Sequence, residues 1–71
     1  MNKQLVKKIV EVFNNNYKYD SIHILVETKD NSYYSYYGLY YDDNHVEFDD
    51  DYDDKISLSY EDIVGIKIGN R

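Results

Sequence analysis

Six of the nine residues from Tyr33 to Tyr41 are tyrosines, and Gly38 lies past the middle of this tyrosine segment. Aromatic side chains favour the pleated, half-buried surface of a β-sheet, so the segment predicts one long strand over residues 33–41. A glycine inside a strand permits a sharp bend at that point. We therefore expect the tyrosine segment to be the centre of a small and strongly bent β-structure.

Both faces of this predicted strand are aromatic, so its period alone does not say which face is buried. Alternation places Tyr33, Ser35, Tyr37, Leu39 and Tyr41 on one face, and Tyr34, Tyr36, Gly38 and Tyr40 on the other. Leu39 favours burial of its own face near the far end, whereas a bend at Gly38 can exchange the two faces. The sequence leaves both arrangements open.

The other elements follow from the spacing of apolar residues. Residues 3–14 carry apolar side chains at helical spacing, and three asparagines at 14–16 are expected to end this amphipathic helix. Alternating apolar residues predict further strands over residues 21–28, 45–49, 55–59 and 63–68. Ser59 is followed three positions later by Asp62, a pattern that predicts one short helical turn before the last strand.

These elements predict a single α+β domain over residues 1–71. An N-terminal helix would be followed by a five-stranded antiparallel, strongly bent sheet or by a small SH3-like or Sm-like barrel. A chain of this length buries only about 60% of its unfolded surface, so the core must be thin. The expected core consists of Leu5, Ile9, Phe13, Ile22, Ile24, Val26, Val46, Phe48, Ile56, Leu58, Ile63, Val64, Ile66 and Ile68.

The order of elements, the span from Ile24 to Phe48 with its two short turns, and the ending Ile56-Ser-Leu-Ser-Tyr-Glu-Asp-Ile-Val-Gly-Ile-Lys-Ile68 resemble the YolD-like and Sm-like small-barrel proteins of Gram-positive bacteria and their phages. The resemblance implies a small barrel. Sm-like RNA binders carry a glycine after the acidic residue of the first hairpin, together with basic or polar loops. This chain has Asp30-Asn31 and an aspartate run there, so RNA binding is not implied.

The net charge of −6 is concentrated in residues 42–54, which hold eight acids and no base. A field of this sign repels nucleic acid and attracts basic surfaces. Repulsion between the closely spaced aspartates of residues 49–54 predicts an extended, solvated loop. No apolar run approaches the roughly 20 residues of a membrane helix and no secretion signal is recognised at Met1, so a cytosolic location is expected.

No pattern in the sequence indicates catalysis or a cofactor. The serines lack a nucleophile elbow, and Gly38, Gly65 and Gly69 form no phosphate-binding loop. His23 and His45 have no cysteine partners, so a zinc site is not predicted and both are expected to face solvent or to pack. A loose Ca²⁺ or Mg²⁺ site formed by Asp49, Asp51 and Asp53 is the alternative to a solvated loop.

The leading hypothesis is therefore a non-enzymatic binding protein whose exposed tyrosines and acidic edge dock onto a basic, nucleic-acid-handling host protein. Phosphate-mimicking anti-CRISPR and anti-restriction proteins are the analogy, and a composition without proline or tryptophan but rich in Asn, Lys, Tyr and Asp is typical of low-GC bacteria and phages. The residues expected to bind the partner are Tyr34, Tyr36, Tyr37, Tyr40, Tyr41, Asp42, Asp43, Glu47, Asp49, Asp50, Asp51, Asp53 and Asp54.

Two further hypotheses belong to different functional classes. In the first, an Sm-like oligomer binds or sequesters a small nucleotide by stacking its base on tyrosines. In the second, the chain is a regulatory or structural subunit, and the last strand, Val64 to Ile68, pairs with a partner chain or with a second copy. The sequence does not decide between a closed barrel and an edge-paired dimer.

Overall fold

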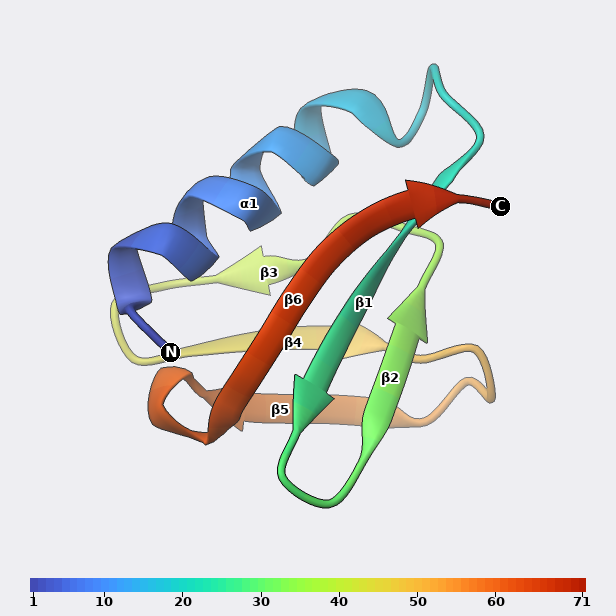
Figure 1. Ribbon diagram of the computed structural model, residues 1–71. Coiled ribbons are helices and arrows are strands. Elements are labelled where there is room, and N and C mark those ends of the chain that lie inside the picture. Colours follow the sequence, from blue (N-terminus) through green and yellow to red (C-terminus); the bar gives the residue numbers. More distant parts are fainter.

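The computed structural model describes all residues from Met1 to Arg71 (Figure 1). One helix precedes six strands, and a 3₁₀ turn separates the last two strands. The elements are α1 (Lys3–Asn16), β1 (Ile22–Thr28), β2 (Ser32–Ser35), β3 (Tyr40–Tyr41), β4 (His45–Asp49), β5 (Lys55–Ser59), η1 (Tyr60–Asp62) and β6 (Ile63–Asn70). This order confirms the predicted α+β class, the N-terminal helix and the short helical turn before the last strand.

The strands form two small antiparallel sheets. In the first sheet the order is β2-β1-β6, and in the second it is β3-β4-β5. The second sheet lies behind the first in Figure 1, with its strands running across those of the first, and α1 lies along one side. The prediction of a single five-stranded sheet or a closed barrel is therefore wrong, because the two sheets share no hydrogen-bonded strand pair.

The division into two sheets arises in the tyrosine segment, whose backbone leaves the first sheet after Ser35 and enters the second at Tyr40. The hydroxyl of the buried Ser35 donates to the carbonyl oxygen of Tyr37 at 2.9 Å. This local bond supports a turn of the backbone immediately after β2. The long strand predicted over residues 33–41 is consequently two short strands with a break between them.

Contacts with the end of α1 hold this break in place. The side-chain amide of Asn14 bonds both backbone groups of Leu39, at 2.8 Å each. A Cβ atom on Gly38 would lie 3.0 Å from the ring of Tyr17, so only glycine leaves space for this close approach. The bend expected at Gly38 lies earlier, at Tyr36 and Tyr37, and Gly38 is instead the point where the segment passes close to the helix.

The break also decides which face of the tyrosine segment is buried. Ser35 and Leu39 are 1% and 5% exposed, and Tyr33 and Tyr41 are half-buried against the core. Tyr37 belongs to the same alternating set, but it lies in the break and is 70% exposed. The face that contains Leu39 is thus the inner one, with Tyr37 as the exception.

The helix begins after Asn2, whose side chain accepts a hydrogen bond from the N–H of Leu5 at 3.1 Å. It ends at Asn16, the last of the three asparagines, two residues beyond the predicted bound of residue 14. The side chain of Asn16 donates to the carbonyl oxygen of Val12 within the helix at 2.7 Å. No helix in the structure is long and apolar enough to cross a membrane.

The core lies between the two sheets and the helix. The buried hydrophobic residues that pack together in this core are Val6, Val10, Phe13, Ile24, Val26, Leu39, Val46, Phe48, Tyr60, Ile63 and Ile66. Two residues predicted for the core are instead exposed, Leu5 by 49% and Val64 by 63%. The strand pairing explains Val64, because the register between β1 and β6 shifts there and leaves this residue as a bulge.

The acidic loop between β4 and β5 is a tight turn, and the prediction of an extended loop is wrong. The side chain of Asp50 is nearly buried and accepts hydrogen bonds from the N–H groups of Tyr52 and Asp54, at 3.0 and 2.9 Å. Asp53 adopts a left-handed conformation with φ of 63°. Local hydrogen bonds to the Asp50 carboxylate therefore outweigh repulsion between neighbouring charges.

Candidate binding surfaces

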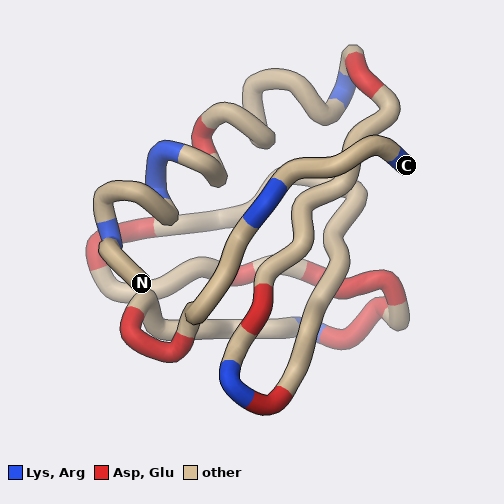
Figure 2. Tube along the Cα trace, in the orientation of Figure 1, with Lys and Arg blue, Asp and Glu red and all other residues tan.

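The structure distributes the predicted partner-binding residues over two separate surfaces. Residues of β3 and β4 lie on the outward face of the second sheet, whereas the tyrosines around the end of β2 lie on the outward face of the first. Figure 2 shows acidic residues at both ends of β4, and lysines along α1 and on β6. The acidic run is thus divided between two ends of one sheet.

The first surface, which we call the acidic face, consists of Tyr40, Asp42, His45, Glu47 and Asp49. Tyr40 lies opposite Glu47 in the pairing of β3 with β4, so the two side chains share a face. The alternate residues Val46 and Phe48 of β4 point into the core. Outward positions of the strand are therefore left to polar and charged side chains.

His45 connects two carboxylates of the acidic face. Its Nδ1 lies 3.1 Å from Asp42 Oδ1, and its Nε2 lies 3.3 Å from Glu47 Oε2. The Tyr40 hydroxyl donates to the other carboxylate oxygen of Asp42 at 3.2 Å, and the Tyr40 and His45 rings are 5.7 Å apart. These contacts hold two acids and an aromatic ring in one arrangement on an exposed surface.

Hydrogen bonding keeps Asp42 ionised. The backbone N–H groups of Asn44 and His45 donate to its carboxylate, at 2.8 and 3.0 Å, and lower the pKa of Asp42. The hydrogen bond to this carboxylate in turn raises the pKa of the Tyr40 hydroxyl. Near neutral pH the acidic face thus carries a fixed negative charge next to a neutral phenol.

The remaining predicted acids occupy different environments. Asp43 forms an ion pair with Lys7 at 2.6 Å, and this partner lowers the pKa of the Asp43 carboxyl. Asp50 supports the β4–β5 turn, while Asp51, Asp53 and Asp54 are exposed along it. No group of three acidic or histidine side chains is arranged to hold a metal ion, so nothing in the structure supports the alternative of a cation site at this loop.

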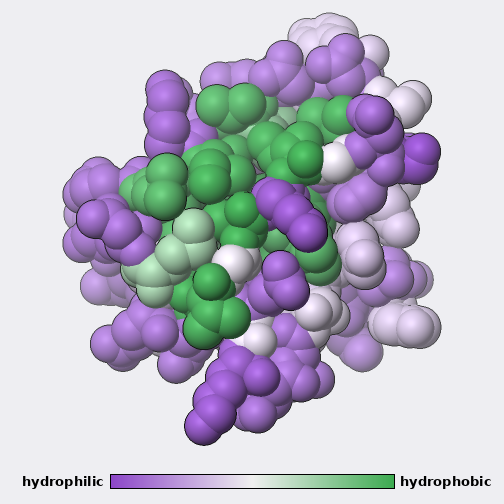
Figure 3. All heavy atoms as spheres, in the orientation of Figure 1, coloured by the Kyte–Doolittle hydropathy of each residue, from purple (hydrophilic) through white to green (hydrophobic).

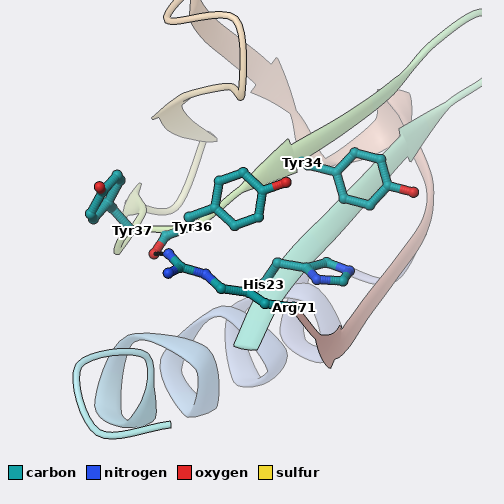
Figure 4. A pocket seen from close by; sticks show the side chains of 5 residues that line it. All are labelled: His23, Tyr34, Tyr36, Tyr37 and Arg71. Atoms are coloured by element: carbon teal, nitrogen blue, oxygen red, sulfur yellow. Dashed lines mark hydrogen bonds between the residues drawn. The ribbon is translucent and has the colours of Figure 1, made fainter. Parts of the chain in front are cut away.

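The second surface is an open groove of about 460 Å³, which we call the tyrosine groove. It is lined by His23, Tyr34, Tyr36, Tyr37 and Arg71 (Figure 4). The His23 ring meets the rings of Tyr34 and Tyr36 edge-on, at centroid distances of 5.1 and 6.2 Å. Tyr41, by contrast, is half-buried against the core and lines neither surface.

Arg71 contacts the tyrosine groove from the end of β6. Its Cζ atom lies 4.8 Å from the centroid of the Tyr36 ring, and Nη2 donates to the carbonyl oxygen of Tyr36 at 3.1 Å. The backbone N–H of Arg71 donates to Ser21 at 3.0 Å, which continues the pairing of β6 with β1. The three tyrosines are among the residues expected to bind a partner, whereas His23 and Arg71 are not.

Strand pairing brings those two residues to the tyrosines. His23 pairs with Gly69, and a Cβ atom at position 69 would lie 3.2 Å from His23 Nε2. The imidazole therefore lies over the glycine of the neighbouring strand. A histidine at an outward position of β1 was the signal in the sequence that could have added His23 to the tyrosines of this site.

A third feature is the apolar surface over α1 and β6, visible as green side chains in Figure 3. The exposed apolar residues of the N-terminus, α1 and β6 are Met1, Leu5, Val12 and Val64. β6 is an edge strand of its sheet. An unpaired strand edge beside exposed apolar side chains is a common site of association between chains.

No family model, curated protein or solved structure matches this chain at a significant level. The geometry of the surfaces is therefore the basis on which a function can be proposed.

Proposed function

We propose that the protein is a non-enzymatic acidic binding protein that docks through its acidic face onto a basic surface of a nucleic-acid-handling host protein. The observation that carries this proposal is the cluster of Tyr40, Asp42, His45 and Glu47 on an exposed sheet face. Carboxylates held on a rigid sheet can occupy the positions of phosphates on a basic surface, and the adjacent aromatic ring supplies desolvated contact area.

The distribution of charge supports this proposal. The chain carries a net charge of −6, and three of its eight basic residues, Lys3, Lys7 and Lys8, lie on α1. On the acidic face itself the only lysine opposite an acid is Lys55, whose Nζ lies 4.0 Å from Asp49 and is well exposed. The acidic face is thus available to attract a cationic partner and to steer it into position.

The same surface is suited to an inhibitor of the anti-CRISPR or anti-restriction kind. Such a protein has to occupy a nucleic-acid site without catalysing a reaction. A preformed carboxylate array on a sheet loses little conformational entropy on binding, which favours tight association. Phosphate mimicry also predicts that the complex and the natural nucleic acid exclude each other.

The proposal can be tested by measuring binding to a panel of nucleases and DNA-binding domains with pI above about 9. The test variant is Glu47→Gln/Asp49→Asn, and its matched control is Asp20→Asn/Asp30→Asn, which removes the same charge at exposed positions away from the acidic face. We expect a partner to lose at least about tenfold in affinity for the test variant and to bind the control nearly as well as the wild type.

Salt provides an independent measurement. Screening should weaken the complex strongly between roughly 50 and 500 mM salt. A change in affinity of less than about twofold over this range of salt concentration would contradict phosphate mimicry. A partner that binds this protein and DNA at the same time would also contradict it.

A second candidate function rests on the apolar surface over α1 and β6. Pairing of the β6 edge with another chain would cover Leu5 and Val64, as expected for a regulatory or structural subunit. Sedimentation at micromolar concentration tests the self-associating form of this function. A dimer that Val64→Lys dissociates and that Tyr52→Lys leaves intact would support this function. Tyr52→Lys is the control because Tyr52 is exposed but lies far away, on the β4–β5 turn. A monomer at all concentrations would rule out self-association.

A further inference from the structure

The tyrosine groove is separate from the acidic face, because the two surfaces lie on the outward faces of different sheets. Its aromatic side chains do not complete the core: Tyr37 is 70% exposed, and Tyr34 is also open to solvent. Edge-on packing against His23 holds the rings of Tyr34 and Tyr36 at defined angles. The groove therefore presents prearranged aromatic surface that the fold itself does not require.

Arg71 adds one cation to this aromatic surface. It makes no ion pair with a side-chain carboxylate of the protein. One of the five guanidinium N–H donors bonds the carbonyl oxygen of Tyr36, which leaves donors for an anionic ligand. Figure 4 shows the guanidinium beside the groove, next to the Tyr36 ring.

We propose that the tyrosine groove binds a nucleoside monophosphate, with the base stacked on the tyrosine rings and the phosphate bound by Arg71. Aromatic side chains stack on any nucleobase, and a guanidinium binds phosphate through paired hydrogen bonds. The volume of about 460 Å³ lies in the range of small-molecule sites. A nucleobase without a phosphate would contact only the tyrosine rings, and a phosphate without a base would contact only Arg71.

The charge of the protein restricts the ligand to a small anion. The net charge of −6 repels a polyanionic strand, and the groove contains a single arginine for neutralisation. One guanidinium can bind one phosphate group through paired hydrogen bonds, which favours a ligand with a single phosphate. The 5′ end of an oligonucleotide offers the same chemistry as a free mononucleotide, so the experiment has to separate the two sources.

Titration of the protein with AMP, GMP, CMP and UMP, followed by NMR chemical shifts of the groove residues, tests the proposal directly. Adenosine lacks the anion, ribose 5-phosphate lacks the base, and a 5′-phosphorylated dA8 strand represents the second source. We expect at least one mononucleotide to bind about tenfold or more tightly than either fragment, and more tightly than the strand. No saturable shift at millimolar mononucleotide would overturn the proposal, and so would tighter binding of the strand.

Variants separate the two halves of the site. Arg71→Ala should weaken binding of the mononucleotide about tenfold or more and leave the weak binding of adenosine unchanged. Lys67→Ala is the matched control, because it removes one charge from β6 outside the groove. Equal losses for the mononucleotide and adenosine, or equal effects of the two variants, would contradict the assigned role of Arg71.

The aromatic half is tested with Tyr37→Ala, since this exposed side chain can be removed with little effect on folding. The variant should weaken the mononucleotide and adenosine alike, whereas Tyr40→Ala on the acidic face should weaken neither. Unchanged binding by Tyr37→Ala/Tyr36→Ala, in a variant with a native circular dichroism spectrum, would overturn the stacking role. The acidic-face variant Glu47→Gln/Asp49→Asn should bind the mononucleotide normally, so the failure of one proposal leaves the other intact.

Discussion

The side chain of Asn14 pairs with the backbone of Leu39 in the manner of a neighbouring strand. Its Nδ2 donates to the carbonyl oxygen of Leu39, and its Oδ1 accepts from the Leu39 N–H, each at 2.8 Å. Leu39 is buried at the break between β2 and β3, where no strand satisfies these backbone groups. One helix side chain thereby fixes the point at which the chain passes from the first sheet to the second.

Replacing Asn14 with alanine should destabilise the protein by about 1–3 kcal/mol, because two backbone groups of a buried residue lose their partner. Urea unfolding followed by circular dichroism measures this change. Asn15→Ala is the matched control, since Asn15 is exposed in the same helix and its side chain makes no hydrogen bond within the protein. Alanine has a higher helix propensity than asparagine, so propensity alone would stabilise both variants. A loss of stability in Asn15→Ala as large as that in Asn14→Ala would therefore contradict the role of the bonds to Leu39.

Replacing Gly38 with alanine should lower the unfolding free energy more than replacing Gly65 with alanine. A Cβ at Gly38 would lie 3.0 Å from the Tyr17 ring, and this ring cannot move freely because it stacks on the buried Phe13 at 5.6 Å. We expect Gly38→Ala to cost about 1–3 kcal/mol in unfolding free energy.

Gly65→Ala is the control for this prediction. Its Cβ would lie 3.1 Å from the carboxylate oxygen of Glu27, which is the end of a flexible side chain and can turn away. The change in unfolding free energy should therefore stay within about 0.5 kcal/mol. Comparable melting temperatures for the two variants would contradict the close approach of Tyr17 to Gly38.

Replacement by alanine should lower the stability of the protein at Asp50 and raise it slightly at Asp51. Asp50→Ala removes the acceptor of two backbone hydrogen bonds in the β4–β5 turn and should destabilise the protein by about 1 kcal/mol. Asp51→Ala removes an equal charge from an exposed side chain and should stabilise the protein slightly by reducing repulsion. Thermal unfolding of both variants distinguishes a hydrogen-bonded turn from an extended loop, in which both substitutions would be stabilising.

The unfolding free energy should decrease as the pH falls below about 4. The pKa values of Asp42 and Asp43 lie below their ordinary value of 3.8, through backbone hydrogen bonds in the first and the Lys7 ammonium in the second. A carboxyl group whose pKa is lower in the folded state stabilises the fold above its unfolded pKa. This contribution is lost as the pH falls through the folded-state pKa.

Urea unfolding at pH 7, 4, 3 and 2 measures the effect. Asp43→Asn should unfold with a shallower acid dependence than the wild type, because it cannot gain a proton at this position. Asp20→Asn, at an exposed position away from both groups, should keep the dependence of the wild type. An unchanged slope in Asp43→Asn would show that its ion pair with Lys7 does not contribute to stability.

Much of the local structure is predictable from residue spacing. The apolar positions of β4 alternate as its strand requires, and the 3₁₀ turn at Tyr60–Asp62 follows the pattern of Ser59 and Asp62. Here Ser59 donates to the Asp62 carboxylate at 2.8 Å instead of capping the turn. In β1, Ile24 and Val26 are buried as predicted, but Leu25 between them is buried as well. Leu39 favours burial of its own face of the tyrosine segment, but alternation alone leaves the choice of face open, and the break between β2 and β3 decides it.

The candidate sites are only partly predictable, since they depend on which strands are neighbours. Tyr34, Tyr36 and Tyr37 stand out in the sequence, but His23 and Arg71 reach them only through the pairing of β1 with β2 and β6. Likewise, the acids of residues 42–54 form one run in the sequence and separate to the two ends of β4 in the fold. Adjacent residues of a strand point to opposite faces, so proximity in sequence is a poor guide to a shared surface.

The sequence by itself determined the helix, the positions of most strands and a strongly negative charge. These properties depend on the periodicity and composition of short segments. Only the tertiary structure decided that the tyrosine segment breaks into strands of two sheets, that Val64 is a bulge and that Asp50 is nearly buried. The bulge depends on the pairing register, and the break depends on the approach of Asn14 and Tyr17 to Gly38 and Leu39. The Asp50 carboxylate is held by hydrogen bonds within its own turn, which the spacing of charges in the sequence does not reveal.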